Sequence, residues 1–238
     1  MIPRRCILGT MNLIMFDIDG TLTQTDAADG KCFVKAVADV FGLSGIDDDW
    51  SRYPHCTDSG ILATIFQEQH GRPPSLPETT EVQEHFVALL AAEARERPFL
   101  PIEGSGKMLA ELMQISEVAV SLASGAWECS ARLKLALAGL DFPRLPAAFA
   151  DDSHAREEIM QVSLARAAQV HGRTCFDAVI YVGDGVWDAR AASRLGFPFF
   201  GIACEPGKRE RLHAEGARHV FHDYRDADSF LGALRDFF

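Results

Sequence analysis

Two aspartates, Asp17 and Asp19, stand two residues apart in the segment FDIDGTLT at 16–23, directly after an apolar run. Carboxylates this close repel each other unless something uses their charge. Magnesium would use it, because this ion prefers a few carboxylate or carbonyl oxygens together with water and substrate phosphate. A carboxylate can also be a covalent nucleophile, and a neighbouring carboxyl group with a raised pKa can act as acid and base. We therefore expect Mg²⁺ here rather than the alternative, a surface Asx turn.

Two further segments offer groups that bind an anion. Ser124 and Gly125 follow the apolar run 118–122, where the serine supplies a hydroxyl and the glycine lets backbone N–H groups approach. Arg156 begins a helical pattern and supplies the positive charge that an anionic nucleophile needs when it meets a phosphate dianion. Helix capping by Ser124 and an ordinary solvated Arg156 are the alternatives, with Lys134 and Lys107 as the other candidate cations.

A second acidic turn, GDGVWD at 183–188, ends another apolar run at 178–182. It provides Asp184 and Asp188, four residues apart. Asp184 is a candidate metal ligand, whereas Asp188 either acts close to the metal or caps the helix that follows.

These turns need elements that bring them together. Four short apolar runs predict strands, and helical patterns fill the spaces between them; the runs are 13–16, 118–122, 178–182 and 199–203. Strands that alternate with helices predict an α/β fold with a doubly wound, Rossmann-like parallel sheet. Ligands bind beyond the carboxyl ends of such strands, where Asp17, Ser124 and Asp184 fall.

The region between the first two runs shows helical patterns only, interrupted by the glycine- and proline-rich stretch 71–77. It predicts a mostly α-helical cap inserted into the core. The expected boundaries are residues 1–24 and 99–238 for the core domain and 25–98 for the cap domain, with Pro98 and Pro101 marking the return.

Taken together, the motifs resemble those of the haloacid dehalogenase (HAD) superfamily. FDIDGTLT matches its hhhDxDGT motif, where h is an apolar residue, and the run ending at Ser124 matches hhhS/T. The resemblance implies that Asp17 attacks phosphorus and that Asp19 first protonates the leaving oxygen and then activates water. It also implies that Ser124, Gly125 and Arg156 hold the phosphate, although the family more often has lysine at the third place.

The turn at 183–188 resembles the family's GDxxxD motif. The resemblance implies that the carboxylates of Asp17 and Asp184 and the backbone carbonyl of Asp19 bind Mg²⁺, while Asp188 orients the cation or a metal-bound water. The cap loop at 53–60 resembles the substrate-facing element of phosphoglycolate-phosphatase-like members, and its candidates are His55, Thr57 and Asp58. Helix capping is the alternative for Thr57 and Asp58.

Composition limits the partners. Lys+Arg 23 against Asp+Glu 34 gives a net charge of -11 without a basic run, so we expect no nucleic acid partner. No run is long and apolar enough for a membrane span, and the N-terminus lacks the features of a signal peptide; Met11 is an alternative start. Six cysteines without a CxxC pair argue against zinc and favour the cytoplasm. The oligomeric state stays open.

The expected function is therefore a Mg²⁺-dependent phosphatase acting on a small phosphorylated metabolite. The family's dehalogenases lack an aspartate at the place of Asp19, so the presence of Asp19 disfavours a dehalogenase. The family's phosphonate-cleaving members use a cap lysine, and the predicted cap is sparse in lysine, with Lys31 and Lys35 as the only candidates. Two alternatives stay open. They are a phosphotransferase resembling β-phosphoglucomutase and a catalytically silent binding protein on the same fold.

Overall fold

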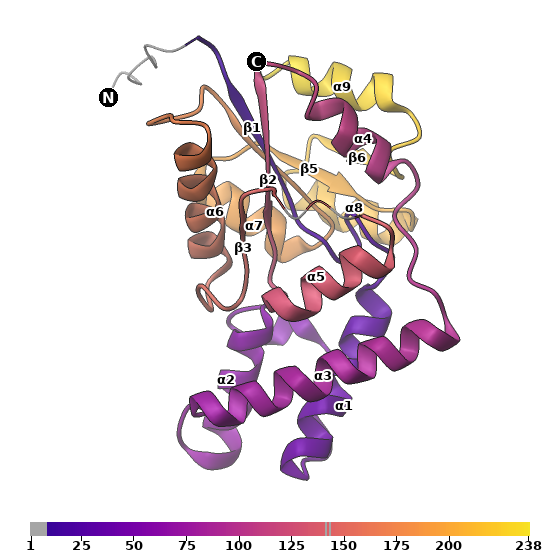
Figure 1. Cartoon of the computed structure of the whole chain (residues 1–238), viewed down its shortest axis with the longest axis vertical. Coiled ribbons are helices and arrows are strands. Elements are labelled where there is room, and N and C mark those ends of the chain that lie inside the picture. Colours follow the sequence, from indigo (N-terminus) through magenta and orange to yellow (C-terminus); the bar gives the residue numbers. More distant parts are fainter. Residues whose placement is uncertain (1–8, 141, 143) are drawn as a thin grey trace.

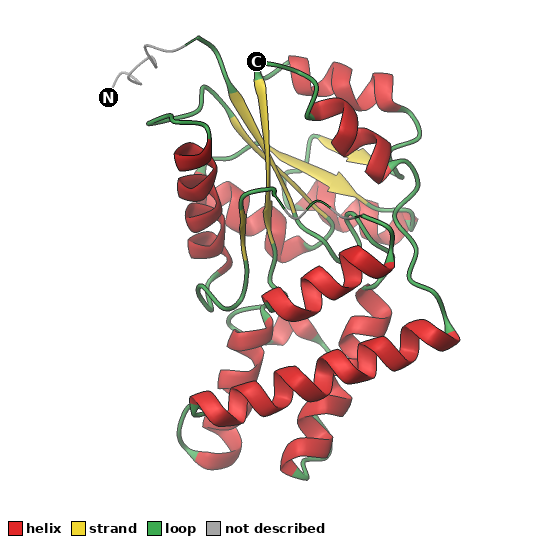
Figure 2. Ribbon diagram, viewed as in Figure 1, coloured by secondary structure: helices red, strands yellow, loops and turns green. Residues whose placement is uncertain are grey.

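The protein is built on one sheet of six parallel strands, described by a computed structural model over residues 9–140, 142 and 144–238 (Figures 1 and 2). Along the sheet the order is β3-β2-β1-β4-β5-β6. The strands are β1 (Asn12–Phe16), β2 (Val118–Ala123), β3 (Ala147–Ala148), β4 (Val179–Gly183), β5 (Phe199–Ile202) and β6 (His219–Phe221). Strands β2 and β3 follow β1 on one side, and strands β4, β5 and β6 follow it on the other. This order confirms the doubly wound parallel sheet predicted from the sequence.

Helices cover both faces of this sheet, which is why its strands are mostly apolar. One face packs against α4 (Ser105–Leu112), α5 (Glu128–Leu137) and α9 (Ala227–Arg235). The other packs against α6 (Arg156–Val170), α7 (Val186–Leu195) and α8 (Pro206–Ala214). Within β1, Ile14 and Phe16 point to the first face and Leu13 and Met15 to the second, as the alternation of a strand requires.

Of the helices between β1 and β2 in the chain, the first three α-helices form the lower part of the molecule in Figure 1. They are α1 (Asp26–Phe41), α2 (Asp58–His70) and α3 (Leu76–Glu96), with a short 3₁₀ helix at Trp50–Arg52. Their apolar side chains form a cluster of their own, which includes Trp127, Ala138 and Ala150 from the core. A separate cluster supports a cap distinct from the core, and the boundaries at residues 24 and 98 stay a prediction.

The insertion is helical as predicted, but one of its helices begins earlier than the sequence suggested. Helix α3 starts at Leu76, inside the stretch 71–77 that was predicted as a break. The reason is a capping box, in which the Glu78 carboxylate accepts hydrogen bonds from the Ser75 backbone N–H at 2.7 Å and hydroxyl at 2.6 Å. Pro77 fits the first turn, where its missing N–H has no partner to lose.

In the part of the chain that the structure describes, no helix combines the length and apolar character needed to cross a membrane. Cys32, Cys56, Cys129 and Cys204 are free thiols, whereas Cys175 is disulfide-bonded. The expectation of a cytoplasmic location stays a prediction. The expectation about a signal peptide depends partly on residues 1–8, which lie outside the described residues.

Candidate active site

A cavity of about 300 Å³ lies where the carboxyl ends of the strands meet the helical insertion. The core contributes the turns after β1, β2 and β4, so Asp17, Ser124 and Asp184 all line it, as expected for a parallel sheet. The insertion contributes residues of α1 and α2 and the loop that precedes α2. Side chains far apart in sequence therefore converge on one enclosed space.

Three buried carboxylates are grouped at this site, and two of them, Asp17 and Asp184, line the cavity. Asp17, Asp184 and Asp188 each offer an oxygen atom within 4.8 Å of the others, and none is more than 6 % exposed. Burial raises the pKa of Asp17 well above its usual range, and the negative charge of Asp188 adds to the effect. Burial likewise raises the pKa of Asp184 to about 7. The cluster carries more negative charge than its surroundings balance, and its oxygen donors fit a hard divalent cation.

Arg156, the first residue of α6, lies against these carboxylates. Its Nη1 atom is 2.9 Å from Asp188 Oδ1 and 3.5 Å from Asp17 Oδ1, and its Nη2 donates to the Cys56 backbone carbonyl at 2.9 Å. The side chain is 10 % exposed, and its Nε–H finds no partner among the described residues. Arg156 is therefore a buried cation between the core carboxylates and the loop before α2, and an ordinary solvated arginine is ruled out.

Asp188 is held by several donors at once. Besides Arg156, it accepts hydrogen bonds from the Tyr181 hydroxyl at 3.3 Å and from the Gly185 backbone N–H at 3.0 Å. The bond from Gly185 caps helix α7, so Asp188 has the capping role that was the alternative prediction. The same side chain also lies close to Asp17. Its side chain is fully buried and so cannot rotate freely.

Ser124 and Gly125 follow β2 and face the same cavity. The Ser124 hydroxyl oxygen accepts a hydrogen bond from the Ala126 backbone N–H at 3.3 Å. At Gly125, a Cβ atom would lie 2.3 Å from Arg156 Nη2 and 2.9 Å from the Cys56 carbonyl oxygen. Glycine is therefore required there because the Arg156 side chain and the Cys56 backbone pass so close.

The family is shown by comparison with known proteins. A family model described as haloacid dehalogenase-like hydrolase matches residues 11–196. This chain belongs to the haloacid dehalogenase-like hydrolases. The match includes all of the residues that carry the resemblance in the sequence. No curated protein matches the chain.

Solved structures share the fold of this haloacid dehalogenase-like hydrolase. A hydrolase from Pseudomonas syringae is 18 % identical with a TM-score of 0.70, covering 95 % of this chain and 99 % of its own. CbbY from Rhodobacter sphaeroides, solved with phosphate, is 19 % identical with a TM-score of 0.64, covering 90 % and 95 %. A haloacid dehalogenase-like protein of unknown function from Agrobacterium tumefaciens is 20 % identical with a TM-score of 0.58, covering 94 % and 99 %.

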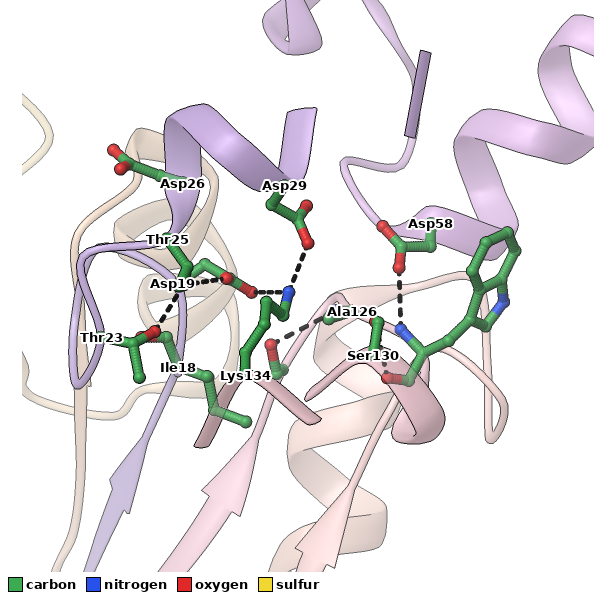
Figure 3. A network of polar contacts seen from close by, with 12 residues as sticks. Ile18, Asp19, Thr23, Thr25, Asp26, Asp29, Asp58, Ala126, Ser130 and Lys134 are labelled. Atoms are coloured by element: carbon green, nitrogen blue, oxygen red, sulfur yellow. Dashed lines mark hydrogen bonds and ion pairs between the residues drawn. The ribbon is translucent and has the colours of Figure 1, made fainter. Parts of the chain in front are cut away.

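Asp19 of this haloacid dehalogenase-like hydrolase lines the cavity with both carboxylate oxygens engaged. Thr25 donates its hydroxyl to Oδ1 at 2.6 Å, and the Lys134 ammonium lies 2.6 Å from Oδ2 (Figure 3). Lys134 also forms an ion pair with Asp29 of α1. Lys107, the other lysine considered as a phosphate-binding cation, is 77 % exposed on α4 and pairs with Glu111.

Sequence reasoning missed Lys208, which lines the cavity of this hydrolase and forms an ion pair with Asp184. It lies in the first turn of α8, after the carboxyl end of β5. A signal was present, because β5 is the neighbour of β4 and its carboxyl end must open into the same crevice. Lys134 was considered only as a phosphate-binding cation, and its contacts with Asp19 and Asp29 were not foreseen.

The three candidate substrate-binding residues of the cap of this hydrolase do not all line the same cavity. Thr57 caps α2 by accepting from the Gly60 N–H at 3.1 Å, so the capping alternative is correct for its side chain, which also lines the cavity. Asp58 also lines the cavity, is 7 % exposed, and accepts from the Trp127 N–H at 2.8 Å, which joins the insertion to the core. His55 lies instead in an adjoining cavity of about 130 Å³.

Proposed function

We propose that the protein is a Mg²⁺-dependent phosphatase that hydrolyses a small phosphorylated metabolite through an aspartyl-phosphate on Asp17. The observation that carries this proposal is the carboxylate of Asp17, buried at the end of β1 and grouped with Asp184 and Asp188 within 4.8 Å. Membership of the haloacid dehalogenase-like hydrolases supports it.

The donor set supports Mg²⁺ as the cofactor. Asp17 and Asp184 would hold the ion through their carboxylates and Asp19 through its backbone carbonyl, while Asp188 and Lys208 would orient the group around it. When bound, Mg²⁺ supplies positive charge that lets an anionic nucleophile approach a phosphate dianion. Burial raises the pKa of Asp17 and Asp184, and a bound divalent cation would favour their ionised forms.

In the first step, a carboxylate oxygen of Asp17 attacks phosphorus in line with the ester oxygen. The new bond joins Asp17 to phosphorus, and the bond between phosphorus and the ester oxygen breaks. Asp19 gives its proton to that oxygen, so the product leaves as a neutral alcohol. Ser124, the backbone at Gly125 and Arg156 hold the phosphoryl oxygens and balance their charge.

In the second step, water attacks the phosphorus of the aspartyl-phosphate. Asp19, now ionised, takes a proton from this water, the bond between phosphorus and Asp17 breaks, and inorganic phosphate leaves. The insertion covers the cavity, and its residues Thr57 and Asp58 are the proposed contacts to the part of the substrate beyond the phosphate.

The proposal is tested with p-nitrophenyl phosphate and excess Mg²⁺. We expect phosphate release that EDTA abolishes, that Asp17→Asn lowers to background, and that the exposed control Asp39→Asn leaves unchanged. Trapping with radiolabelled phosphoester should label the wild type and not Asp17→Asn. Full turnover by Asp17→Asn would exclude the nucleophile, and an absence of turnover with every phosphoester tried would favour a binding protein.

The same reaction separates hydrolysis from phosphotransfer. With a sugar monophosphate present as an acceptor, a phosphatase passes the labelled phosphoryl group to water and yields inorganic phosphate. A phosphotransferase passes it to the sugar and yields a bisphosphate. The ratio of the two labelled products therefore decides between the two activities.

A further inference from the structure

Lys134 is a buried lysine that phosphate binding does not account for. It projects from α5, is 0 % exposed, and is not among the residues that line the cavity. Its ammonium group lies between two carboxylates, 2.6 Å from Asp19 Oδ2 and paired with Asp29 (Figure 3). Asp19 comes from the turn after β1 and Asp29 from α1, so one side chain joins the core to the insertion.

Burying a lysine is costly even when it is paired, because two or more charges lose their hydration. Helix α5 would pack at least as well with an apolar residue at this place, as it does with Ala131 and Leu135. The cost of the charge therefore points to a requirement other than packing. The requirement that the contacts indicate is the orientation of Asp19.

The Asp19 carboxylate is fixed from two sides. Lys134 engages Oδ2, and Thr25 donates to Oδ1 at 2.6 Å. The Thr25 hydroxyl oxygen is in turn 2.5 Å from that of Thr23, whose single proton is shared between Thr25 and the Ile18 carbonyl oxygen, 3.2 Å away. This chain of contacts and the Lys134 ion pair leave the carboxylate little freedom to turn about its Cβ–Cγ bond.

We propose, on the basis of the function proposed above, that Lys134 is a positioning residue for Asp19 and fixes it relative to α1 through Asp29. Lysine suits this place because its ammonium has three donors and can bond both carboxylates at once. A proton donor must lie within hydrogen-bond reach of the leaving oxygen, so a misplaced Asp19 slows departure of the alcohol. Lys134 itself touches no substrate.

The prediction depends on the leaving group. Lys134→Met should lower kcat about 100-fold for phenyl phosphate, whose leaving oxygen needs a proton, and less than about 10-fold for 2,4-dinitrophenyl phosphate, whose leaving oxygen does not. KM for both esters should change little, because no contact with the phosphate is lost. Lys107→Met, an exposed lysine on α4, is the matched control and should behave as the wild type.

A variant that leaves Asp19 and Asp29 without a partner can fail to fold. Asp29→Asn provides a second test, because it keeps Lys134 beside Asp19 and removes the negative charge that holds Lys134 to α1. It should show the same dependence on the leaving group with a smaller loss. The double variant Lys134→Met with Asp29→Asn removes one negative charge together with the positive one and restores the folded state, as followed by thermal unfolding.

The outcomes separate the two proposals. Equal losses for both esters in folded Lys134→Met and Asp29→Asn would overturn the positioning role, since a merely structural residue has no reason to depend on the leaving group. A wild type with no Mg²⁺-dependent turnover of either ester would instead overturn the proposed function. A loss confined to phenyl phosphate supports both.

Discussion

The backbone of Gly20 passes so close to Asp184 that a Cβ atom on Gly20 would lie 2.0 Å from Asp184 Oδ2. Gly20 also has φ +69°, a conformation that residues with a side chain rarely adopt. The turn after β1 and the turn after β4 therefore approach each other only because the residue after Asp19 is glycine. This contact brings the two acidic turns together, as the proposed cation site requires.

We expect Gly20→Ala to displace Asp184 and lower phosphatase activity about 100-fold or more, because misplacing groups by about 1 Å costs this much. Gly42→Ala is the matched control. Gly42 has φ +65°, but a Cβ atom on it would meet no other atom within 4 Å, so its variant carries the backbone strain of about 1–2 kcal/mol without the clash. Equal activity of the two variants would show that the contact has no role.

Arg156 gives a second prediction. Arg156→Met leaves Asp17 and Asp188 without their cation and should lower kcat/KM about 100-fold or more. Arg156→Lys should recover only part of this loss. Two nitrogens of the planar guanidinium group contact Asp188 and the Cys56 carbonyl, and a lysine ammonium group lacks this planar arrangement of donors. Arg166→Met is the control, since Arg166 is 45 % exposed and pairs with Asp152. Full activity of Arg156→Met would overturn its role in binding phosphate.

The sequence predicted the sheet and the meeting of its acidic turns, because both follow from local pattern. Apolar runs mark buried strands, and the carboxyl ends of parallel strands meet at one edge. Asp17 and Asp184 could therefore be placed together without coordinates. Strands β3 and β6 were missed, because two and three residues are too short to show a period.

The contacts of the lysines could not be derived in the same way. Whether Lys134 faces phosphate or Asp19 depends on how α5 packs between the sheet and the insertion, which is a tertiary property. The same holds for His55, which lies in an adjoining cavity although it is two residues from Thr57. Motifs specify residue types and their order, whereas side-chain direction depends on the packed helices around them.

Metal affinity should depend on pH through Asp184. In the metal-free protein burial raises the pKa of this carboxyl group to about 7, and Lys208 opposes the rise. Mg²⁺ needs the ionised carboxylate, so binding below this pH must release a proton. The Kd for Mg²⁺ should rise at least about tenfold for each pH unit below about 7, because the raised pKa of Asp17 adds to the proton release from Asp184. Calorimetry in buffers of different ionisation enthalpy measures the released proton.

Lys208→Met sharpens this test. Removing the ammonium group removes the contribution that lowers the pKa of Asp184, so the midpoint of the pH dependence should move upward. Lys107→Met, which changes an exposed lysine far from Asp184 in sequence, should leave the midpoint where it is. A Kd that stays constant between about pH 6 and about pH 8 would contradict a titrating ligand.

Asp58 should make the protein less stable as the pH rises. Burial, followed by the charge of Asp29, raises the pKa of Asp58 well above its usual range. An acid with a raised pKa in the folded state favours folding below its unfolded pKa, and this contribution disappears as the pH rises through the folded pKa. Asp58→Asn keeps an acceptor for the Trp127 N–H and should raise Tm at pH 8, by about 2–4 °C for each kcal/mol gained.

The gain from Asp58→Asn should vanish below about pH 3, where the aspartate is protonated in both states. Asp39→Asn is the control of opposite sign, because hydrogen bonds from His85 and Lys35 lower the pKa of Asp39. Its carboxylate favours folding above the unfolded pKa, and that contribution is lost as the pH falls through the folded pKa. Asp39→Asn should therefore lower Tm slightly at pH 8. Identical pH profiles of Tm for Asp58→Asn and the wild type would mean that the pKa of Asp58 is the same in the folded and the unfolded protein.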